Sequence, residues 1–93
     1  MEQAKVYFSD LRAPIGTNLL KKLEKLIRTA GIDGIDMEKK LVAIKIHFGE
    51  PGNLSFLRPN YAKVVADVVK SMGGVPFLTD CNTLYVGGRK NAL

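Results

Sequence analysis

The sequence has one cysteine and no tryptophan, and nowhere does it approach the roughly 18 consecutive apolar residues of a membrane span. A lone Cys81 excludes an intrachain disulfide, a four-thiolate zinc site and an iron–sulfur cluster held by this chain alone. The first ten residues, MEQAKVYFSD, lack the basic and then apolar order of a secretory signal. We therefore expect a cytoplasmic chain with no membrane partner, no metal site and no cofactor of its own.

Acidic residues are fewer than basic ones: 9 Asp and Glu against 14 Lys and Arg give a formal net charge of 14 − 9 = +5. With 46% apolar and 25% charged residues in a chain of 93, the composition is that of a folded domain and not of a disordered tail. We expect residues 1–93 to form a single α/β domain or the N-terminal fragment of a larger one.

Hydrophobic periodicity predicts five elements. Alternating and near-continuous apolar runs indicate strands, and apolar stripes at helical spacing indicate helices. Thr17 suits the N-cap of the first helix, and Pro59 suits the first position of the second. Residues 89–93 are typical of a first helical turn. The predicted strands are at about 5–9, 41–47 and 75–79, and the predicted helices at about 17–30 and 59–72.

This order predicts a three-stranded parallel sheet of βαβαβ topology with right-handed crossovers, as part of a larger α/β domain. If the strand order is consecutive, both helices cover one face of the sheet and leave the other bare. We expect a missing C-terminal portion or a homo-oligomer to cover the open sheet face.

The loops that follow parallel strands emerge at one edge of the sheet, where open α/β sheets bind ligands. Two helix N-termini and several cations at this edge favour a small anionic ligand, although the charges could instead neutralise one another. Arg58→Ala is the substitution expected to abolish binding. The candidate ligand-binding residues are Asp10, Arg12, Lys45, His47, Glu50, Asn53, Arg58, Asp80, Asn82 and Thr83; Cys81 and Tyr85 share the last loop.

Lys45, His47 and Cys81 each allow two interpretations. Lys45 either extends its ammonium to the sheet edge or meets a carboxylate or ligand anion. His47 is either a hydrogen-bonded structural residue or a base. A nucleophilic pair of Cys81 with His47 requires the second and third strands to be neighbours, which the apolar 41–47 run favours, whereas a lone cysteine is ordinarily a small packed side chain.

A basic stripe on the first helix offers a weaker alternative, nucleic-acid binding. No aromatic residues interleave with it, and a solvated helix face explains it equally well. The stripe consists of Lys21, Lys22, Lys25 and Arg28.

Four strings of residues resemble the N-terminal part of the family called domain of unknown function 362. They are VYFSDLRA (6–13), VAIKIHFGEPGN (42–53), RPNYAKVV (58–65) and FLTDCNTLYVGGRKNA (77–92). The resemblance implies an iron–sulfur-associated protein of unknown activity, in which a ferredoxin-like, cysteine-rich region absent here holds a 4Fe–4S cluster. Members of that family are longer, which favours reading this chain as an N-terminal portion. The alternative role is a non-catalytic docking module for that electron-transfer region.

Overall fold

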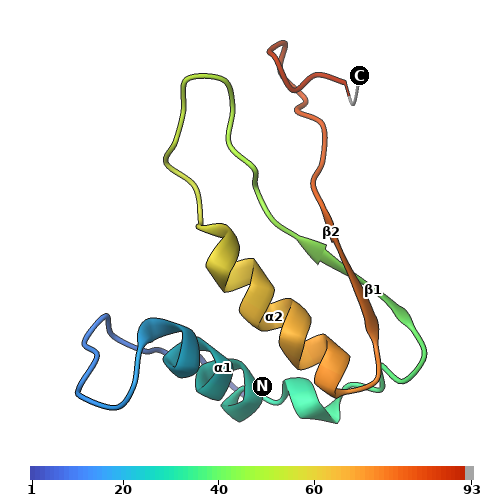
Figure 1. Cartoon of the computed structure of the whole chain (residues 1–93). Helices are drawn as coiled ribbons and strands as arrows, with labels where there is room; N and C mark the ends of the chain where they lie inside the picture. Colours follow the sequence, from blue (N-terminus) through green and yellow to red (C-terminus); the bar gives the residue numbers. More distant parts are fainter. Residues whose placement is uncertain (92–93) are drawn as a thin grey trace.

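The computed structural model describes residues 1–91 and has a mixed α/β fold (Figure 1). In chain order, its elements are helix α1 (Leu19–Thr29), the 3-10 turn η1 (Ile32–Gly34), strand β1 (Leu41–Lys45), helix α2 (Pro59–Ser71) and strand β2 (Val75–Thr79). No helix in the described part of the chain is long and apolar enough to cross a membrane.

Strands β1 and β2 are parallel neighbours, with Ala43 opposite Phe77 in the register. Helix α2 forms the crossover between them. Pro59 occupies its first turn, where the missing N–H is not needed, and Gly73 ends it at φ +79, a left-handed conformation that favours glycine. The predicted adjacency of the strands at 41–47 and 75–79 is confirmed.

The predicted strand at 5–9 is not present, so the described sheet has two strands and the βαβαβ topology is not formed. Val6 and Phe8 are 90% and 85% exposed, and among the described residues no backbone group of 5–9 bonds to β1 or β2. Alternation supplies a strand pattern, but a strand also needs a hydrogen-bonded neighbour. This segment lies along α1 instead.

Helix α1 begins at Leu19, and its N-cap is Asn18, one residue after the predicted Thr17. The Asn18 side chain accepts a hydrogen bond from the Lys21 N–H at 2.9 Å. Strand β1 is shorter than the predicted 41–47 and ends at Lys45, although the Ile46 N–H still donates to the Thr79 carbonyl at 3.0 Å.

Helix α2 is the central layer of the molecule. It packs against both strands on one side and against α1 on another, whereas α1 does not contact either strand in the described structure. The buried apolar side chains are Met37, Ala62, Val68 and Val69. Three of these four belong to α2, which therefore holds the small core together.

Candidate functional site

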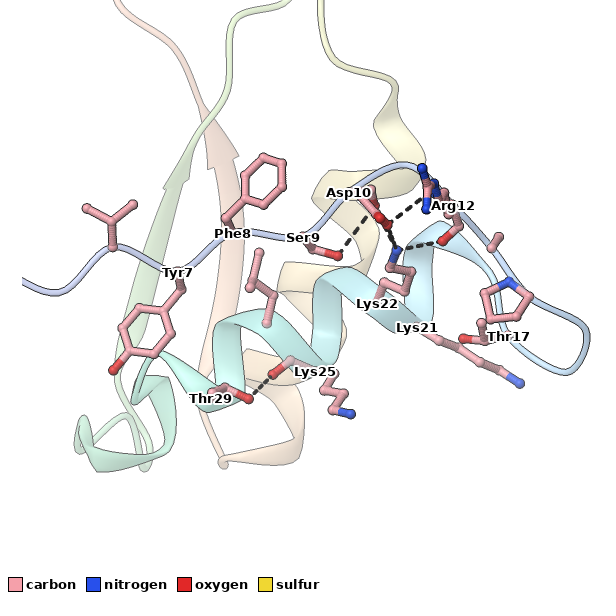
Figure 2. Close-up of a pocket in the computed structure, with 14 residues that line it drawn as sticks. Tyr7, Phe8, Ser9, Asp10, Arg12, Thr17, Lys21, Lys22, Lys25 and Thr29 are labelled. Carbon is pink, nitrogen blue, oxygen red and sulfur yellow. Dashed lines mark hydrogen bonds and ion pairs between the residues drawn. The ribbon is translucent and has the colours of Figure 1, made fainter.

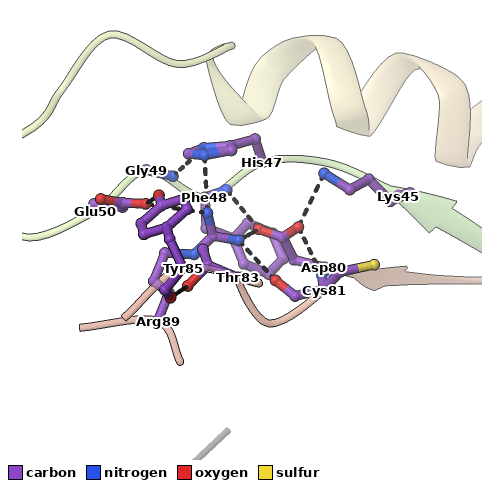
Figure 3. Close-up of polar contacts among 10 residues, drawn as sticks. All are labelled: Lys45, His47, Phe48, Gly49, Glu50, Asp80, Cys81, Thr83, Tyr85 and Arg89. Atoms are coloured by element: carbon purple, nitrogen blue, oxygen red, sulfur yellow. Dashed lines mark hydrogen bonds and ion pairs between the residues drawn. The ribbon is translucent and has the colours of Figure 1, made fainter. Parts of the chain in front are cut away.

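Asp80 joins the two loops that leave the carboxyl ends of the strands (Figure 3). Its side chain is 8% exposed and accepts from Lys45 Nζ at 2.9 Å and from the N–H groups of Cys81 and Phe48 at 2.7 and 3.2 Å. Lys45 and Cys81 contact Oδ1, whereas the Phe48 N–H and Arg89 Nη2, which forms an ion pair, contact Oδ2. The hydrogen bond from Lys45, with the two N–H donors and the charge of Arg89, holds the pKa of Asp80 far below its ordinary value, despite the opposing effect of desolvation.

Arg89 is the centre of the polar cluster. Its side chain is 17% exposed, and Nη2 donates to the Cys81 carbonyl at 3.0 Å in addition to Asp80. Nη1 lies 2.8 Å from His47 Nε2 and 3.9 Å from Glu50 Oε1. The Arg89 guanidinium therefore connects the loop after β2 to the loop after β1, because its two terminal nitrogens contact residues of different loops.

His47 meets a hydrogen-bond donor at each ring nitrogen. Nδ1 lies 2.8 Å from the Gly49 backbone nitrogen, and Nε2 lies 2.8 Å from Arg89 Nη1. A neutral imidazole has one acceptor nitrogen, so it accepts from Gly49 or from Arg89 but not from both. In either tautomer, one of these two donors faces the ring's own N–H, and an added oxygen acceptor would satisfy it.

A second link joins the loops through Tyr85, whose hydroxyl donates to Glu50 Oε1. This hydrogen bond to a carboxylate raises the pKa of Tyr85 above its ordinary value. Thr83 shapes the same loop, since its Oγ1 donates to the Tyr85 carbonyl and its N–H donates to the Arg89 carbonyl, both at 2.9 Å.

A shallow hollow of about 540 Å³ opens beside His47 and is lined further by Asn53, Ser55, Phe56 and Leu57. Gly49, at φ +86, lets the Phe56 ring lie close: a Cβ built on Gly49 would stand 2.6 Å from Phe56 Cδ1. The Asn53 N–H donates to the Glu50 carbonyl at 2.8 Å, which closes the turn beneath. The His47 ring therefore has open space next to it.

The structure brings together only part of the predicted set. Lys45, His47, Glu50 and Asp80 are in one cluster, with Thr83 and Asn53 supporting it. Arg58 is the exposed N-cap of α2, and neither its side chain nor that of Asn82 makes a hydrogen bond or ion pair with any described residue.

Asp10 and Arg12 form a separate group near the start of α1 (Figure 2). Asp10 Oδ1 accepts from Lys22 Nζ at 2.6 Å and from the Arg12 N–H at 3.1 Å, and these contacts, the one from Lys22 first, lower the pKa of Asp10. Because no strand forms at 5–9, the loop after it is not carried to the edge where β1 and β2 end.

Half of the basic stripe on α1 is neutralised by ion pairs. Lys22 is paired with Asp10, and Arg28 is paired with Glu24 and Asp33. Lys21 and Lys25 line a hollow of about 1090 Å³ between the N-terminal segment and α1 (Figure 2). Two unpaired lysines give weaker support to nucleic-acid binding than the four cations in the sequence suggest.

Cys81 contributes its backbone to the cluster, and its sulfur is directed away from the His47 ring (Figure 3). Arg89 is the residue that touches both His47 and the Cys81 carbonyl. Adjacent strands therefore bring the two segments together without forming a thiol–imidazole pair. In residues 1–91, no three His, Cys, Asp or Glu side chains cluster closely enough to hold a metal ion.

Sequence reasoning missed Arg89 as a site residue. The run 89–93 had the pattern of a helical turn, but residues 89–91 are not helical, and 92–93 lie outside the described residues. Tyr85 stood in the predicted loop without a role. The available signal was the string FLTDCNTLYVGGRKNA, which contains both residues.

A family model described as Domain of unknown function (DUF362) matches residues 42–92. The matched region runs from β1 through α2 and β2 and includes both loops of the polar cluster. Nothing among the curated proteins or the solved structures matches the chain.

Proposed function

This chain belongs to the DUF362 family, and we propose that it binds a small anionic ligand at the carboxyl ends of β1 and β2. The observation that carries the proposal is a surplus of donors around His47: the Gly49 N–H and Arg89 Nη1 face the two ring nitrogens, and a neutral ring offers only one acceptor. An oxygen of a carboxylate or phosphate would satisfy the donor that is left over.

The surroundings of the donors support this ligand class. Arg89 Nη2 is occupied by Asp80 and by the Cys81 carbonyl, and the Asp80 ion pair keeps the guanidinium in place, with Nη1 directed toward His47. The hollow beside His47 leaves room for the ligand's remaining atoms. Glu50 Oε1, 3.9 Å from Arg89 Nη1, would disfavour multiply charged anions by repulsion.

In the protein as a whole, we propose that this ligand site accompanies an iron–sulfur region, as the family resemblance implies. The 4Fe–4S cluster would be held by a cysteine-rich region and not by this chain, which has one cysteine. A cytoplasmic location remains part of the proposal. No reaction is assigned to the site.

Calorimetric titration with inorganic phosphate and with acetate tests the ligand site. Arg89→Ala should weaken binding at least tenfold, because it removes one donor and releases Asp80. Lys90→Ala is the matched control, since it deletes the same charge from the adjacent exposed position. Circular dichroism verifies that each variant is folded.

The proposal fails if Arg89→Ala binds as tightly as the wild type, or if Arg58→Ala alone abolishes binding. Arg58 at the N-cap of α2 is the competing anion site, because its guanidinium has no partner among the described residues.

The alternative is a non-catalytic docking module for a ferredoxin-like electron-transfer domain. The observation that favours it is internal neutralisation: the charges of Lys45 and Arg89 are opposed by Asp80 and Glu50. In that case, the cluster only clamps the two loops together. Absence of heat in both titrations, with a folded protein, would favour docking over ligand binding.

A further inference from the structure

The hollow beside His47 has walls that are apolar or uncharged. Phe56 and Leu57 supply the apolar part, and Asn53 and Ser55 supply uncharged polar groups. Sites for small molecules typically have volumes of about 300–1,000 Å³, apolar walls and a few well-placed polar groups. At about 540 Å³, the hollow therefore has the size and the composition to hold an apolar part of a ligand whose anionic group lies at the ring.

The apolar wall and the donors at His47 are parts of one loop. A Cβ built on Gly49, at φ +86, would stand 2.6 Å from Phe56 Cδ1, so the Phe56 ring lies directly on the glycine backbone. The N–H of the same Gly49 faces His47 Nδ1 at 2.8 Å (Figure 3). The turn at Gly49 therefore fixes the apolar wall and the imidazole ring relative to each other.

Asn53 adds a second donor to the hollow. Its Oδ1 accepts from the Ser55 N–H at 2.9 Å, which leaves its NH₂ group without a hydrogen-bond partner among the described residues. Together with the donor left over at His47, this group gives the site two donors. Two donors match the two oxygens of a carboxylate, whereas a phosphate would bring further oxygens that need partners.

The charges around the donors favour a ligand with a single negative charge. Lys45 and Arg89 are opposed by Asp80 and Glu50, so these four side chains have a net charge of 2 − 2 = 0. Glu50 Oε1, 3.9 Å from Arg89 Nη1, repels a dianion more strongly than a monoanion. A carboxylate carries one charge at neutral pH, whereas a phosphate ester carries about 1.5 to 2.

We propose that the ligand is a monocarboxylate with an apolar group, its carboxylate at His47 and Arg89 and its apolar group against Phe56 and Leu57. This inference rests on the proposed anion site and adds the chemical class of its ligand. Transfer of the apolar group from water into the hollow contributes to affinity, and the carboxylate fixes the orientation.

Calorimetric titrations with acetate, benzoate and benzyl alcohol at neutral pH test the proposal. Benzoate should bind at least about tenfold more tightly than acetate, because its ring enters the hollow. Benzyl alcohol has the ring without the charge and should bind at least about tenfold more weakly than benzoate. Phosphate, titrated in parallel, should bind more weakly than acetate.

Leu57→Ala should weaken benzoate binding by about threefold or more and leave acetate binding unchanged, because it removes part of the apolar wall. Leu57 is 65% exposed, so the variant should fold, which circular dichroism verifies. Leu54→Ala is the matched control: Leu54 is in the same loop, is 87% exposed and does not line the hollow, so benzoate binding should not change.

Acetate and benzoate affinities that are equal, and that both fall in Arg89→Ala, would overturn the inference and leave the proposed anion site standing. Equal effects of Leu57→Ala and Leu54→Ala on benzoate binding would overturn it as well, as would benzoate binding that survives Arg89→Ala unchanged. Absence of binding by both anions would overturn the proposed anion site itself, and this inference with it.

Discussion

Asp80 shows how one side chain positions two loops. Its carboxylate accepts hydrogen bonds from β1, from the loop after β1 and from the loop after β2, so each segment limits the movement of the others. Because these donors stabilise the charged form, the pKa of Asp80 is lower in the folded protein than the value of about 3.9 in an unfolded chain. The folded state then binds fewer protons than the unfolded state in acid.

The contribution of ionised Asp80 to the stability of the folded state is therefore present above about pH 4, which is near the unfolded-state pKa. This contribution is lost as the pH falls below that value. At pH 7, Asp80→Asn should lower the urea midpoint of unfolding. The difference between wild type and variant should shrink progressively between about pH 4 and about pH 2. Urea titrations of both proteins at a series of pH values, at fixed protein concentration, measure this difference in midpoint.

Asp67→Asn is the control, since its ion pair with Lys63 lies on the exposed surface of α2. The midpoint of this variant should differ little from that of the wild type at any pH. Equal acid dependence of the Asp80→Asn difference and the Asp67→Asn difference would contradict the account of Asp80.

At the scale of the element, helix α1 depends on its N-cap. Asn18→Ala removes the acceptor for the Lys21 N–H and should reduce the free energy of unfolding by about 1 kcal/mol. Thr17→Ala should change it by less than about 0.5 kcal/mol, because the Asn18 side chain provides the cap. Urea denaturation followed by circular dichroism measures both. A larger loss for Thr17→Ala would show that the helix begins one residue earlier.

The junction between α2 and β2 depends on close approach at Gly74. A Cβ there would stand 2.7 Å from Cγ1 of the buried Val69 and 3.2 Å from the Met37 carbonyl oxygen. Gly74→Ala should therefore destabilise the fold by about 1–3 kcal/mol through overpacking. Gly34→Ala is the control, since a Cβ at Gly34 meets nothing within 4 Å. Equal stability of the two variants in urea would argue against this packing.

The elements that the sequence predicted correctly are those whose signals are local. Pro59 and Gly73 bound α2, and the apolar runs 41–47 and 75–79 contain β1 and β2. The segment 5–9 differs because a strand must pair with the edge of another strand that is distant in the sequence. Periodicity does not reveal whether such an edge is available. Lys45 pairs with the Asp80 carboxylate, and a lysine in an apolar strand is the local signal that suggested such a partner. Arg89 contacts His47, which lies 42 positions earlier in the chain, and sequence spacing carries no signal over that separation.

At the scale of the whole molecule, Cys81 limits the redox chemistry that the chain can perform alone. Anaerobic reconstitution with iron and sulfide should leave no stoichiometric cluster, because one thiolate is fewer than the four ligands that a cluster needs. Visible absorption and iron analysis measure this. Cys81→Ala is the control and should give the same residual iron. A stoichiometric cluster that disappears in Cys81→Ala would contradict the prediction.

The position of the anion is the central claim, and nitrogen-detected NMR of the arginine and histidine side chains during an acetate titration tests it most directly. The account predicts saturable shifts of the Arg89 guanidinium and the His47 ring nitrogen signals, with Arg12 and Arg58 unchanged, because the surplus of donors lies between Arg89 and His47. Shifts confined to Arg58, or unchanged Arg89 and His47 signals at saturating acetate, would contradict it.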